Sequence, residues 1–288
     1  MKKGTILFLT LLLVFTLALT GCFGSQNNAA QQPAQQNEQQ DEQQPAENKD
    51  TSWEDIKARG YFIVGLDDSF PPMGFRDEKN EIVGFDIDLA KAAAEKMGIE
   101  VKFQPIVWTN AILELNNKNV DVIWNGMTIT EERKQKINFS KPYLANRLII
   151  ITQADSPINT KADLAGKKVA VQAGSSAADA VKADPEALKS FGELVEFGTY
   201  TEALMDVSAG RMDAVIIDEV VGRYYIAKEP TRYKVLEDHY GSEEYGIGFR
   251  KSDAAFQAEL QKAVDALIED GTAKAISEKW FGADIVLK

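Results

Sequence analysis

Short apolar segments typical of buried strands alternate with helical segments along most of the chain. Tyr61–Leu66 and Lys168–Gln172 have the length and the β-branched content of buried strands. Asp86–Met97, which Gly98 follows, and Thr201–Ala209 have helical periodicity. This alternation predicts an α/β fold with open, mostly parallel sheets that carry helices on both faces.

The same reasoning predicts the remaining elements. Residues 51–54 fit a capping box at the start of a helix that ends at Gly60. The other predicted strands are Val101–Ile106, Val120–Trp124, Leu148–Thr152, Ala214–Ile217 and Tyr245–Arg250. The other predicted helices are Ala111–Asn116, Ser176–Lys182, Glu219–Ile226, Asp253–Asp270 and Thr272–Trp280.

Two segments share one pattern: a helix end, a polar turn, Val or Met before Asp, and a buried strand. They are residues 116–126 (NNKNVDVIWNG) and 208–218 (SAGRMDAVIID). The repetition predicts two similar lobes. Ligands of open α/β sheets bind beyond the carboxyl ends of the strands. We therefore expect Asn125, Gly126 and Thr128 of one lobe to face Asp218 of the other across a cleft.

Composition excludes several classes of function. The 288 residues suffice for one large or two modest domains. The net charge of −12 argues against nucleic acid as a partner. Cys22 and His239 are the only cysteine and the only histidine, so no Cys/His zinc site is expected. The chain also has no GxxxxGK[ST] phosphate loop, and we expect neither a metal nor a cofactor.

The N-terminus has the organisation of a secretory signal. Lys2 and Lys3 precede the apolar segment Ile6–Leu19, which is shorter than the roughly 20 residues that span a bilayer. Small residues then lead to Cys22, a pattern that resembles the lipobox of bacterial lipoproteins. It predicts a signal peptide over residues 1–21 and lipid on Cys22. The alternative is a signal peptide that is cut nearby, with an incidental cysteine.

Residues 22–50 are rich in Gln, Asn, Ala and Pro and contain almost no large apolar side chain. This composition predicts a disordered tether. A lipid anchor with a flexible spacer suits a protein that meets a membrane partner while it samples the space outside. We therefore expect an extracytoplasmic protein that is lipid-anchored to the outer face of the cell membrane.

One candidate for an anion site follows the strand that ends near Trp124. Thr128 precedes a short helix that contains Arg133, and free N–H groups at the helix start together with a planar guanidinium suit a carboxylate. The alternative is a capping box of Thr128 and Glu131, with Arg133 as a solvated surface charge. Spacing alone leaves both interpretations open.

Two more candidates lie in the second predicted lobe. Gln172 ends a strand, and Ser175 and Ser176 follow it at a helix start, where the pattern suits either an anion or ordinary N-capping. Asp218 ends an apolar strand, where a carboxylate is costly unless it meets a cation or hydrogen-bond donors. A ligand ammonium is a natural partner, and N-capping of the next helix is the alternative.

Aromatic and acidic residues follow two further strands. Asp67, Asp68 and Phe70 come directly after the first strand, at the edge where ligands bind. Trp108 follows the strand that ends at Ile106 and would cover an apolar stem of the ligand, although most Trp residues simply bury area. One Arg, one Asp and two helix starts together form a receptor for a zwitterion.

Several segments carry a resemblance to a known family. They are residues 65–98 (GLDDSFPPMGFRDEKNEIVGFDIDLAKAAAEKMG), 120–143 (VDVIWNGMTITEERKQKINFSKPY), 169–176 (VAVQAGSS), 213–218 (DAVIID), 245–249 (YGIGF) and 278–282 (EKWFG). In sequence and in order they resemble the extracellular substrate-binding proteins of polar amino-acid ABC importers. The resemblance covers essentially all of residues 52–282.

The resemblance implies a two-lobed, type II periplasmic-binding-protein-like fold with a two-strand hinge. Lobe I is expected to comprise residues 52–147 and 241–288, and lobe II residues 148–240. The implied function is a receptor that captures a polar L-amino acid by hinge closure and delivers it to the membrane permease of an ABC importer. We expect a monomer with no enzymatic activity.

The resemblance also implies a role for each candidate residue. The implied partners of the ligand α-carboxylate are Arg133, Thr128 and Ser176, and those of the α-ammonium are Asp218 and the Gly126 carbonyl. Asp67 matches a position that contacts the ligand side chain, and Phe70 and Trp108 match the two aromatic positions that sandwich the ligand. Gln172 stands where glutamine-binding members of the family carry a lysine. Asn125 stands where many relatives carry a small residue. Asp67, Asp68 and Asn125 favour a neutral polar or basic ligand side chain, because an unpaired like charge is costly in a closed cleft.

Two alternatives remain on the same fold. The resemblance extends to cyclohexadienyl dehydratases, in which case Asp67 or Asp68 would be a general acid with a raised pKa. The pair Arg133 and Asp218 and the lipobox favour the receptor instead. The second alternative is a sensory amino-acid-binding module, which would need a separate membrane partner.

Overall fold

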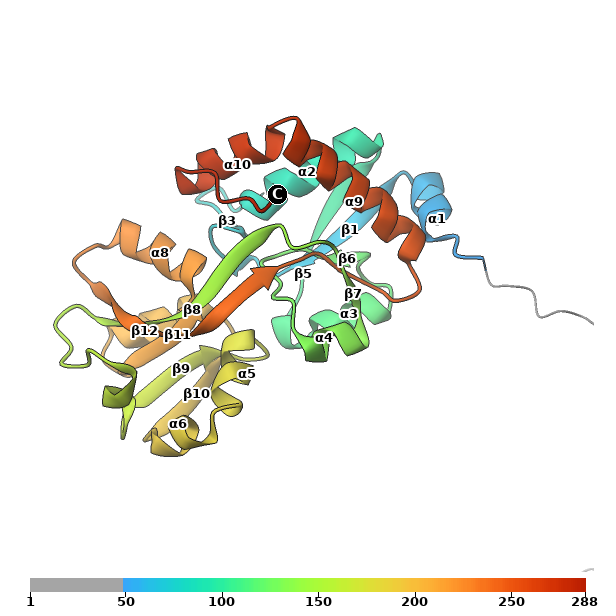
Figure 1. Ribbon diagram of the computed structural model, residues 1–288. Coiled ribbons are helices and arrows are strands. Elements are labelled where there is room, and N and C mark those ends of the chain that lie inside the picture. Colours follow the sequence, from blue (N-terminus) through green and yellow to red (C-terminus); the bar gives the residue numbers. More distant parts are fainter. Residues whose placement is uncertain (1–48) are drawn as a thin grey trace, which may run out of the picture. The chain divides into compact units, whose positions relative to one another are not determined.

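The computed structural model describes residues 49–288 (Figure 1). The predicted signal peptide, Cys22 and the predicted tether up to residue 48 lie outside the described residues. Within residues 49–288, no helix has both the length and the apolar character needed to cross a membrane.

The described residues form helices and strands that alternate over part of the chain. The helices are α1 Ser52–Arg59, α2 Phe85–Met97, η1 Trp108–Asn110, α3 Ala111–Asn116, α4 Glu131–Lys136, η2 Lys161–Leu164, α5 Ser176–Lys182, α6 Pro185–Ser190, α7 Tyr200–Ser208, α8 Glu219–Lys228, α9 Ala254–Glu269 and α10 Thr272–Phe281. The strands are β1 Tyr61–Leu66, β2 Ser69–Phe70, β3 Gly74–Arg76, β4 Ile82–Val83, β5 Glu100–Pro105, β6 Val122–Ile123, β7 Asn138–Phe139, β8 Leu144–Gln153, β9 Lys168–Gln172, β10 Glu193–Phe197, β11 Ala214–Asp218, β12 Tyr233–Tyr245 and β13 Gly248–Phe249.

The first sheet has the strand order β5-β1-β6-β13-β7. β1 is parallel to β5 and β6, whereas β13 is antiparallel to β6 and β7. Helices α2, α9 and α10 pack against one another on one side, and α3 packs against β1 and β6 (Figure 1). A small antiparallel sheet of β2, β3 and β4 follows β1.

The second sheet has the order β10-β9-β11-β8-β12. β9 is parallel to β10 and β11, whereas β8 is antiparallel to β11 and β12. The predicted α/β class is confirmed, but both sheets are mixed rather than mostly parallel. The antiparallel partners β8, β12 and β13 lie where the chain passes between the sheets without a crossover helix, and a strand that enters in this way can run against its neighbours.

Consecutive residues of the central strands belong to different apolar cores. Val122 of β6 lies in the core beneath α2 and α9, whereas Ile123 packs with the side chains of α3 on the other face. On β11, Ile217 and Ile216 divide in the same way between two cores. All four side chains are fully buried. Coverage of both faces explains why these strands appear in the sequence as continuous apolar runs.

Two long strands, β8 and β12, connect the sheets (Figure 1). They pair antiparallel from Gln153 to Leu144 of β8, with two register irregularities that flank His239. Tyr245, at the end of β12, forms an isolated bridge with Thr128, which precedes α4 and lies close to the first sheet. The predicted boundaries of the two lobes stay a prediction.

The predicted capping box at the first helix is wrong. Thr51 is the N-cap of α1, but its hydroxyl donates to the Asp55 carboxylate at 3.0 Å instead of accepting a backbone N–H. Asp50, one residue earlier, accepts the N–H of Ser52 at 2.9 Å. The helix ends at Gly60 as predicted, with Gly60 in the left-handed conformation.

The predicted strand Tyr245–Arg250 is also wrong. Tyr245 ends β12, and only the residues of β13 pair within the first sheet. The chain changes sheets between them, so one apolar run supplies residues to two strands. The predicted strand Val120–Trp124 is shorter in the structure, since only the two residues of β6 pair.

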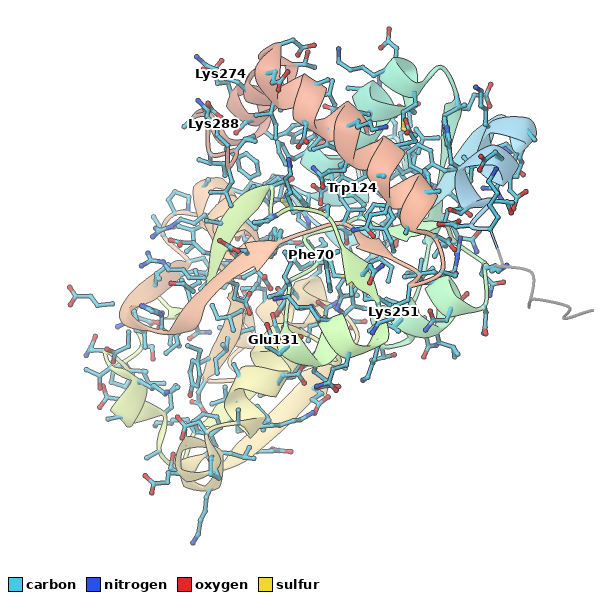
Figure 2. The ribbon with its side chains drawn as sticks, turned by 45° about the vertical axis from the view of Figure 1, so that its right-hand side comes forward. Phe70, Trp124, Glu131, Lys251, Lys274 and Lys288 are labelled. Carbon is cyan, nitrogen blue, oxygen red and sulfur yellow. The ribbon has the colours of Figure 1, made fainter. Side chains whose placement is uncertain are left out.

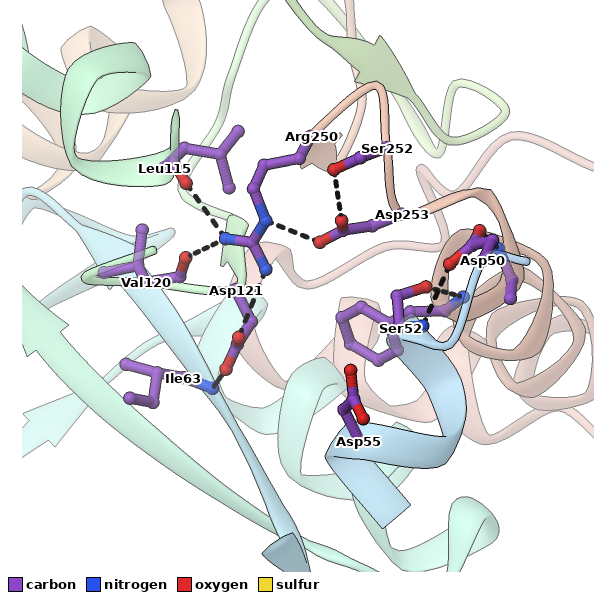
Figure 3. Close-up of polar contacts among 12 residues, drawn as sticks. Asp50, Ser52, Asp55, Ile63, Leu115, Val120, Asp121, Arg250, Ser252 and Asp253 are labelled. Atoms are coloured by element: carbon purple, nitrogen blue, oxygen red, sulfur yellow. Dashed lines mark hydrogen bonds and ion pairs between the residues drawn. The ribbon is translucent and has the colours of Figure 1, made fainter. Parts of the chain in front are cut away.

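Arg250 follows β13 and is buried among four chain segments (Figure 3). Its Nε donates to Asp253 Oδ2 at 2.5 Å. Its Nη1 donates to the carbonyl oxygens of Leu115, at 2.9 Å, and Val120, and its Nη2 pairs with Asp121 Oδ1 at 3.3 Å. This guanidinium therefore joins the ends of α3 and β13 to the starts of β6 and α9.

Candidate ligand-binding site

Asp67 and Asn125 lie together where β1 and β6 end. The Asp67 N–H donates to Asn125 Oδ1 at 3.1 Å, and Asp67 Oδ1 accepts from the N–H and the hydroxyl of Ser69. Asn125 Nδ2 has no hydrogen-bond partner among the described residues and lies against Gly74 of β3. Asn125, which follows β6, thus supports the backbone of Asp67, which follows β1. Burial raises the pKa of the Asp67 carboxyl.

Gly126 needs to be glycine in this structure. Its φ is +56°, and a Cβ would lie 2.8 Å from the ring of Phe70 and 3.1 Å from that of Tyr245. Its N–H donates to Asp86 Oδ2 at 2.8 Å, and burial raises the pKa of Asp86 to about 7. Phe70 lies inside the fold (Figure 2) and its ring packs 5.9 Å from that of Tyr200 on α7.

Arg133 is 8% exposed and points inward from α4. Its Nη1 donates to the Thr128 carbonyl at 2.9 Å, and its Nη2 donates to the Gly174 carbonyl at 3.1 Å. No carboxylate of the described residues lies within 4 Å of it. The alternative of a solvated charge is therefore wrong, and so is the alternative capping box, because Thr130 caps α4 and Glu131 is exposed (Figure 2).

Gln172 at the end of β9 and Ser176 at the start of α5 directly contact residues that follow the strands of the first sheet. Gln172 Nε2 donates to Asp67 Oδ2 at 2.7 Å, and the hydroxyls of Ser176 and Thr128 lie 3.1 Å apart. Ser175 is the N-cap of α5, since its hydroxyl accepts the N–H of Ala178. Ser175 therefore positions the start of α5, whereas Ser176 faces Thr128.

Asp218 ends β11 and is 3% exposed. Its Oδ1 accepts from Asn146 Nδ2 at 2.8 Å and from the Tyr245 hydroxyl at 2.5 Å. It is the N-cap residue of α8, but its side chain makes no capping hydrogen bond. Burial, and then the neighbouring Glu243, raise the pKa of Asp218 to about 7.

Sequence reasoning missed Tyr245, whose hydroxyl donates to Asp218, and two further polar residues of this network, Asn146 and Glu243. Glu243 Oε2 accepts from Thr128 Oγ1 and from Asn146 Nδ2, each at 3.1 Å. Burial raises the pKa of Glu243. Asn146 and Glu243 belong to the connecting strands β8 and β12, in polar stretches whose residues carry no local signal of a site.

Trp108 lines a cavity of 280 Å³ together with Arg133 and Gly174. It is half-buried and packs against the apolar cluster around α3. Phe70 is not among the residues that line this cavity, so the predicted pairing of the two aromatic side chains around a ligand stays a prediction.

The arrangement is chemically complementary to a zwitterion. Arg133 is a buried cation without an acidic partner, and Asp218 is a buried carboxyl without a basic partner, among the described residues. Each is costly to bury alone, so a ligand with both charges would compensate the two. Within residues 49–288, no group of three or more His, Cys, Asp or Glu side chains is arranged to hold a metal ion.

Comparison with known proteins gives consistent matches. The family model described as bacterial extracellular solute-binding proteins, family 3, matches residues 62–283. The L-cystine-binding protein TcyJ of Escherichia coli (strain K12) is 31% identical over 235 residues, which cover 80% of this chain and 86% of that protein.

Solved structures are similar over most of the chain. An ABC uptake transporter substrate-binding protein from Streptococcus pneumoniae with bound histidine has a TM-score of 0.80 and 37% identity, with 83% of this chain and 99% of that chain covered. The ancestral amino acid-binding protein AncCDT-1, a precursor of cyclohexadienyl dehydratase, has a TM-score of 0.73 and 36% identity, with 79% and 98% covered.

Proposed function

The chain belongs to family 3 of the bacterial extracellular solute-binding proteins, and we propose that it captures a polar L-amino acid for an ABC importer. The observation that carries this proposal is the pair of buried, oppositely charged and mutually unpaired groups, Arg133 and Asp218. An α-amino acid carries a carboxylate for the first and an ammonium for the second. The relatives named above bind cystine and histidine, two such molecules.

The proposed contacts follow from this polarity. We assign the α-carboxylate to Arg133, with Thr128 and Ser176 beside it, and the α-ammonium to Asp218, with the Gly126 carbonyl. Asp67, Phe70, Trp108, Asn125, Gln172 and Ser175 complete the proposed site, as direct contacts or as supports. Gln172 Nε2 donates to Asp67 Oδ2 at 2.7 Å. We propose that a neutral polar or basic side chain of the ligand extends toward this pair.

The proposed mechanism is closure about β8 and β12, with 52–147 and 241–288 as one lobe and 148–240 as the other. Contacts such as Gln172 to Asp67 and Arg133 to the Gly174 carbonyl join the two sheets and would break on opening. Since the ligand bridges groups from both lobes, it binds the closed state more tightly and shifts the population toward it. The permease partner would then recognise the closed monomer.

A thermal-shift screen tests the proposed function. The chain without its predicted signal peptide (residues 22–288, with Cys22→Ala) is unfolded and refolded to remove any bound ligand. It is then heated with each standard amino acid, cystine and ornithine. A ligand that binds only the folded state raises the unfolding temperature. We expect one or a few polar amino acids to raise the unfolding temperature. If none of them raises it, the proposal is contradicted.

The affinity for the amino acid is expected to be about tenfold higher at pH 8 than at pH 6. The pKa of Asp218 is raised to about 7, and only its ionised form pairs with an ammonium. Asp218 is mostly protonated at pH 6 and mostly ionised at pH 8, whereas the ligand keeps its α-carboxylate and its α-ammonium. Isothermal titration calorimetry at pH 6, 7 and 8 measures the effect. Equal affinities at the three pH values would contradict the role of Asp218.

We also propose that lipid on Cys22 anchors the protein to the outer face of the cell membrane. Cys22→Ala is then expected to move the protein from the membrane fraction to the soluble extracytoplasmic fraction, because the variant cannot carry the lipid that is proposed to hold the protein at the membrane. Fractionation followed by immunoblotting measures this change. A wild-type protein that is already soluble, or a variant that stays in the membrane fraction, would refute the anchor.

A second candidate function is a dehydratase, supported by the likeness to AncCDT-1 and by the raised pKa of the buried Asp67. A general acid needs such a pKa, but Asp67 is already bound by Gln172 and Ser69 in this structure. We therefore favour a binding protein without enzymatic activity. Incubation with a cyclohexadienyl substrate, followed by ultraviolet absorbance, distinguishes the two: turnover that Asp67→Asn abolishes would establish the enzyme.

A further inference from the structure

Glu243 is a third carboxyl group in the candidate ligand site. Its Oε2 contacts Thr128 Oγ1 and Asn146 Nδ2 at 3.1 Å, and the same Asn146 nitrogen donates to Asp218 Oδ1 at 2.8 Å. Because one nitrogen donates to both carboxylates, Glu243 and Asp218 are neighbours. Thr128 also places Glu243 beside the hydroxyl of Ser176, in the region assigned to the ligand's charged groups.

The nearby surface cations are paired with other residues. Glu243 partly lines an open pocket of 640 Å³ that Lys134 and Arg147 also line. Lys134 pairs with Glu131 at 2.8 Å, and Arg147 pairs with Glu219 at 2.5 Å. Among the described residues, no lysine or arginine nitrogen lies within 4 Å of the Glu243 carboxylate, so no ion pair neutralises it.

The site therefore holds more acid than base. Asp67, Asp218 and Glu243 are three carboxyl groups without an ion pair, and Arg133 is the cation that the described residues place among them. A ligand with an uncharged side chain brings one positive and one negative group and leaves the excess of acid unchanged. Burying like charges is costly, so closure on such a ligand requires proton uptake or a loss of affinity.

We propose that Glu243 is a specificity-determining residue, which makes the site prefer amino acids with a second cationic group over their neutral isosteres. This inference deepens the proposed function and rests on it. A guanidinium or a second ammonium supplies the positive charge that the site lacks, and the carboxylates then stay ionised in the closed state. The preferred ligand class is thus the basic amino acids, within the wider class of neutral polar and basic ones.

L-Arginine and L-citrulline test this inference, because they have nearly the same shape and differ in charge. Isothermal titration calorimetry at pH 7.5 compares the refolded chain (residues 22–288, with Cys22→Ala) with its Glu243→Gln variant. We expect the parent to bind arginine at least about tenfold more tightly than citrulline, and the variant to lose most of this preference. Citrulline affinity is expected to rise rather than fall, because the variant has one carboxylate fewer to bury and its glutamine retains an acceptor for Thr128 and Asn146.

Glu244→Gln is the matched control. Glu244 is the next residue of β12, is exposed and points to the other face of the strand, so its replacement is expected to leave both affinities unchanged. A parent protein without a preference for arginine would overturn the inference. A Glu243→Gln variant that keeps the preference for arginine would also overturn it. So would a variant whose affinities for arginine and citrulline fall equally, since Glu243 would then support the α-ammonium or the fold.

Failure of the inference and failure of the proposed function are distinguishable. If neither arginine nor citrulline binds while the screen finds another amino acid, the preference for a basic ligand is wrong and the proposed function stands. If no amino acid binds, the proposed function fails, and the inference fails with it.

Discussion

Arg133→Met is expected to weaken amino-acid binding by roughly 100-fold or more, because truncation of one partner leaves the ligand carboxylate buried and unpaired. Methionine keeps most of the side-chain volume but offers no donor. Among the described residues, the Arg133 guanidinium donates only to the carbonyl oxygens of Thr128 and Gly174, so the free energy of unfolding is expected to change by about 1 kcal/mol or less. Calorimetric titration measures the first effect and urea denaturation the second.

Lys134→Met is the control for this prediction. Lys134 is the next residue of α4, but its side chain is half exposed and pairs with the exposed Glu131. Such surface pairs contribute little, so both affinity and stability are expected to stay near the parent values. An Arg133→Met protein that binds within fivefold of the parent would show that the carboxylate is held elsewhere.

Arg250→Met is expected to lower the free energy of unfolding by about 3–5 kcal/mol, since loss of one partner leaves buried charges uncompensated. The side chains of Asp253 and Asp121 and the carbonyls of Leu115 and Val120 all lose a donor (Figure 3). Ligand affinity per folded molecule is expected to change little, because Arg250 lies outside the site. Urea denaturation monitored by tryptophan fluorescence measures the change.

Arg59→Met is the matched control for Arg250. Arg59 also pairs with Asp121, but its side chain is 35% exposed. A partly exposed pair is expected to contribute about 1 kcal/mol or less. Equal losses for the two variants would mean that burial of Arg250 does not determine its contribution.

Helix ends and fully buried strands could be predicted from the sequence, because each depends on residues that are neighbours in the chain. Helix α2 ends at Gly98, and α1 ends at Gly60, because a left-handed terminal residue favours glycine wherever the helix lies. The strands β1, β9 and β11 are covered on both faces, and their continuous apolar runs identify them without knowledge of their partners.

Elements that depend on distant partners were missed or misplaced. β12 has thirteen residues, but its sequence YKVLEDHYGSEEY is mostly polar, and two register irregularities break its alternation. Its structure comes from pairing with β8, far away in the sequence. The prediction of mostly parallel sheets failed for the same reason, since strand direction at β8 and β13 depends on the path between the sheets.

The residues of the candidate site also include some that the sequence could suggest and others that it could not. Asp218 and Arg133 could be singled out as candidates because each combines a charge with a position at a strand end or a helix start, although spacing alone left the burial of Arg133 open. Glu243 and Asn146 were not predictable, because only the pairing of β8 with β12 brings both side chains beside Asp218. Asn125 accepts the backbone N–H of Asp67 in the structure, and its predicted contact with the ligand stays a prediction.

The central claim is that Arg133 and Asp218 together hold an α-amino acid. Its most direct test is a calorimetric titration of the refolded chain with the amino acid found by the screen and with two analogues, one without the α-carboxylate and one without the α-ammonium. We predict that each analogue binds at least about 100-fold more weakly, and that Arg133→Met binds the amino acid and its decarboxylated analogue equally. Analogues that bind as tightly as the amino acid would contradict the claim.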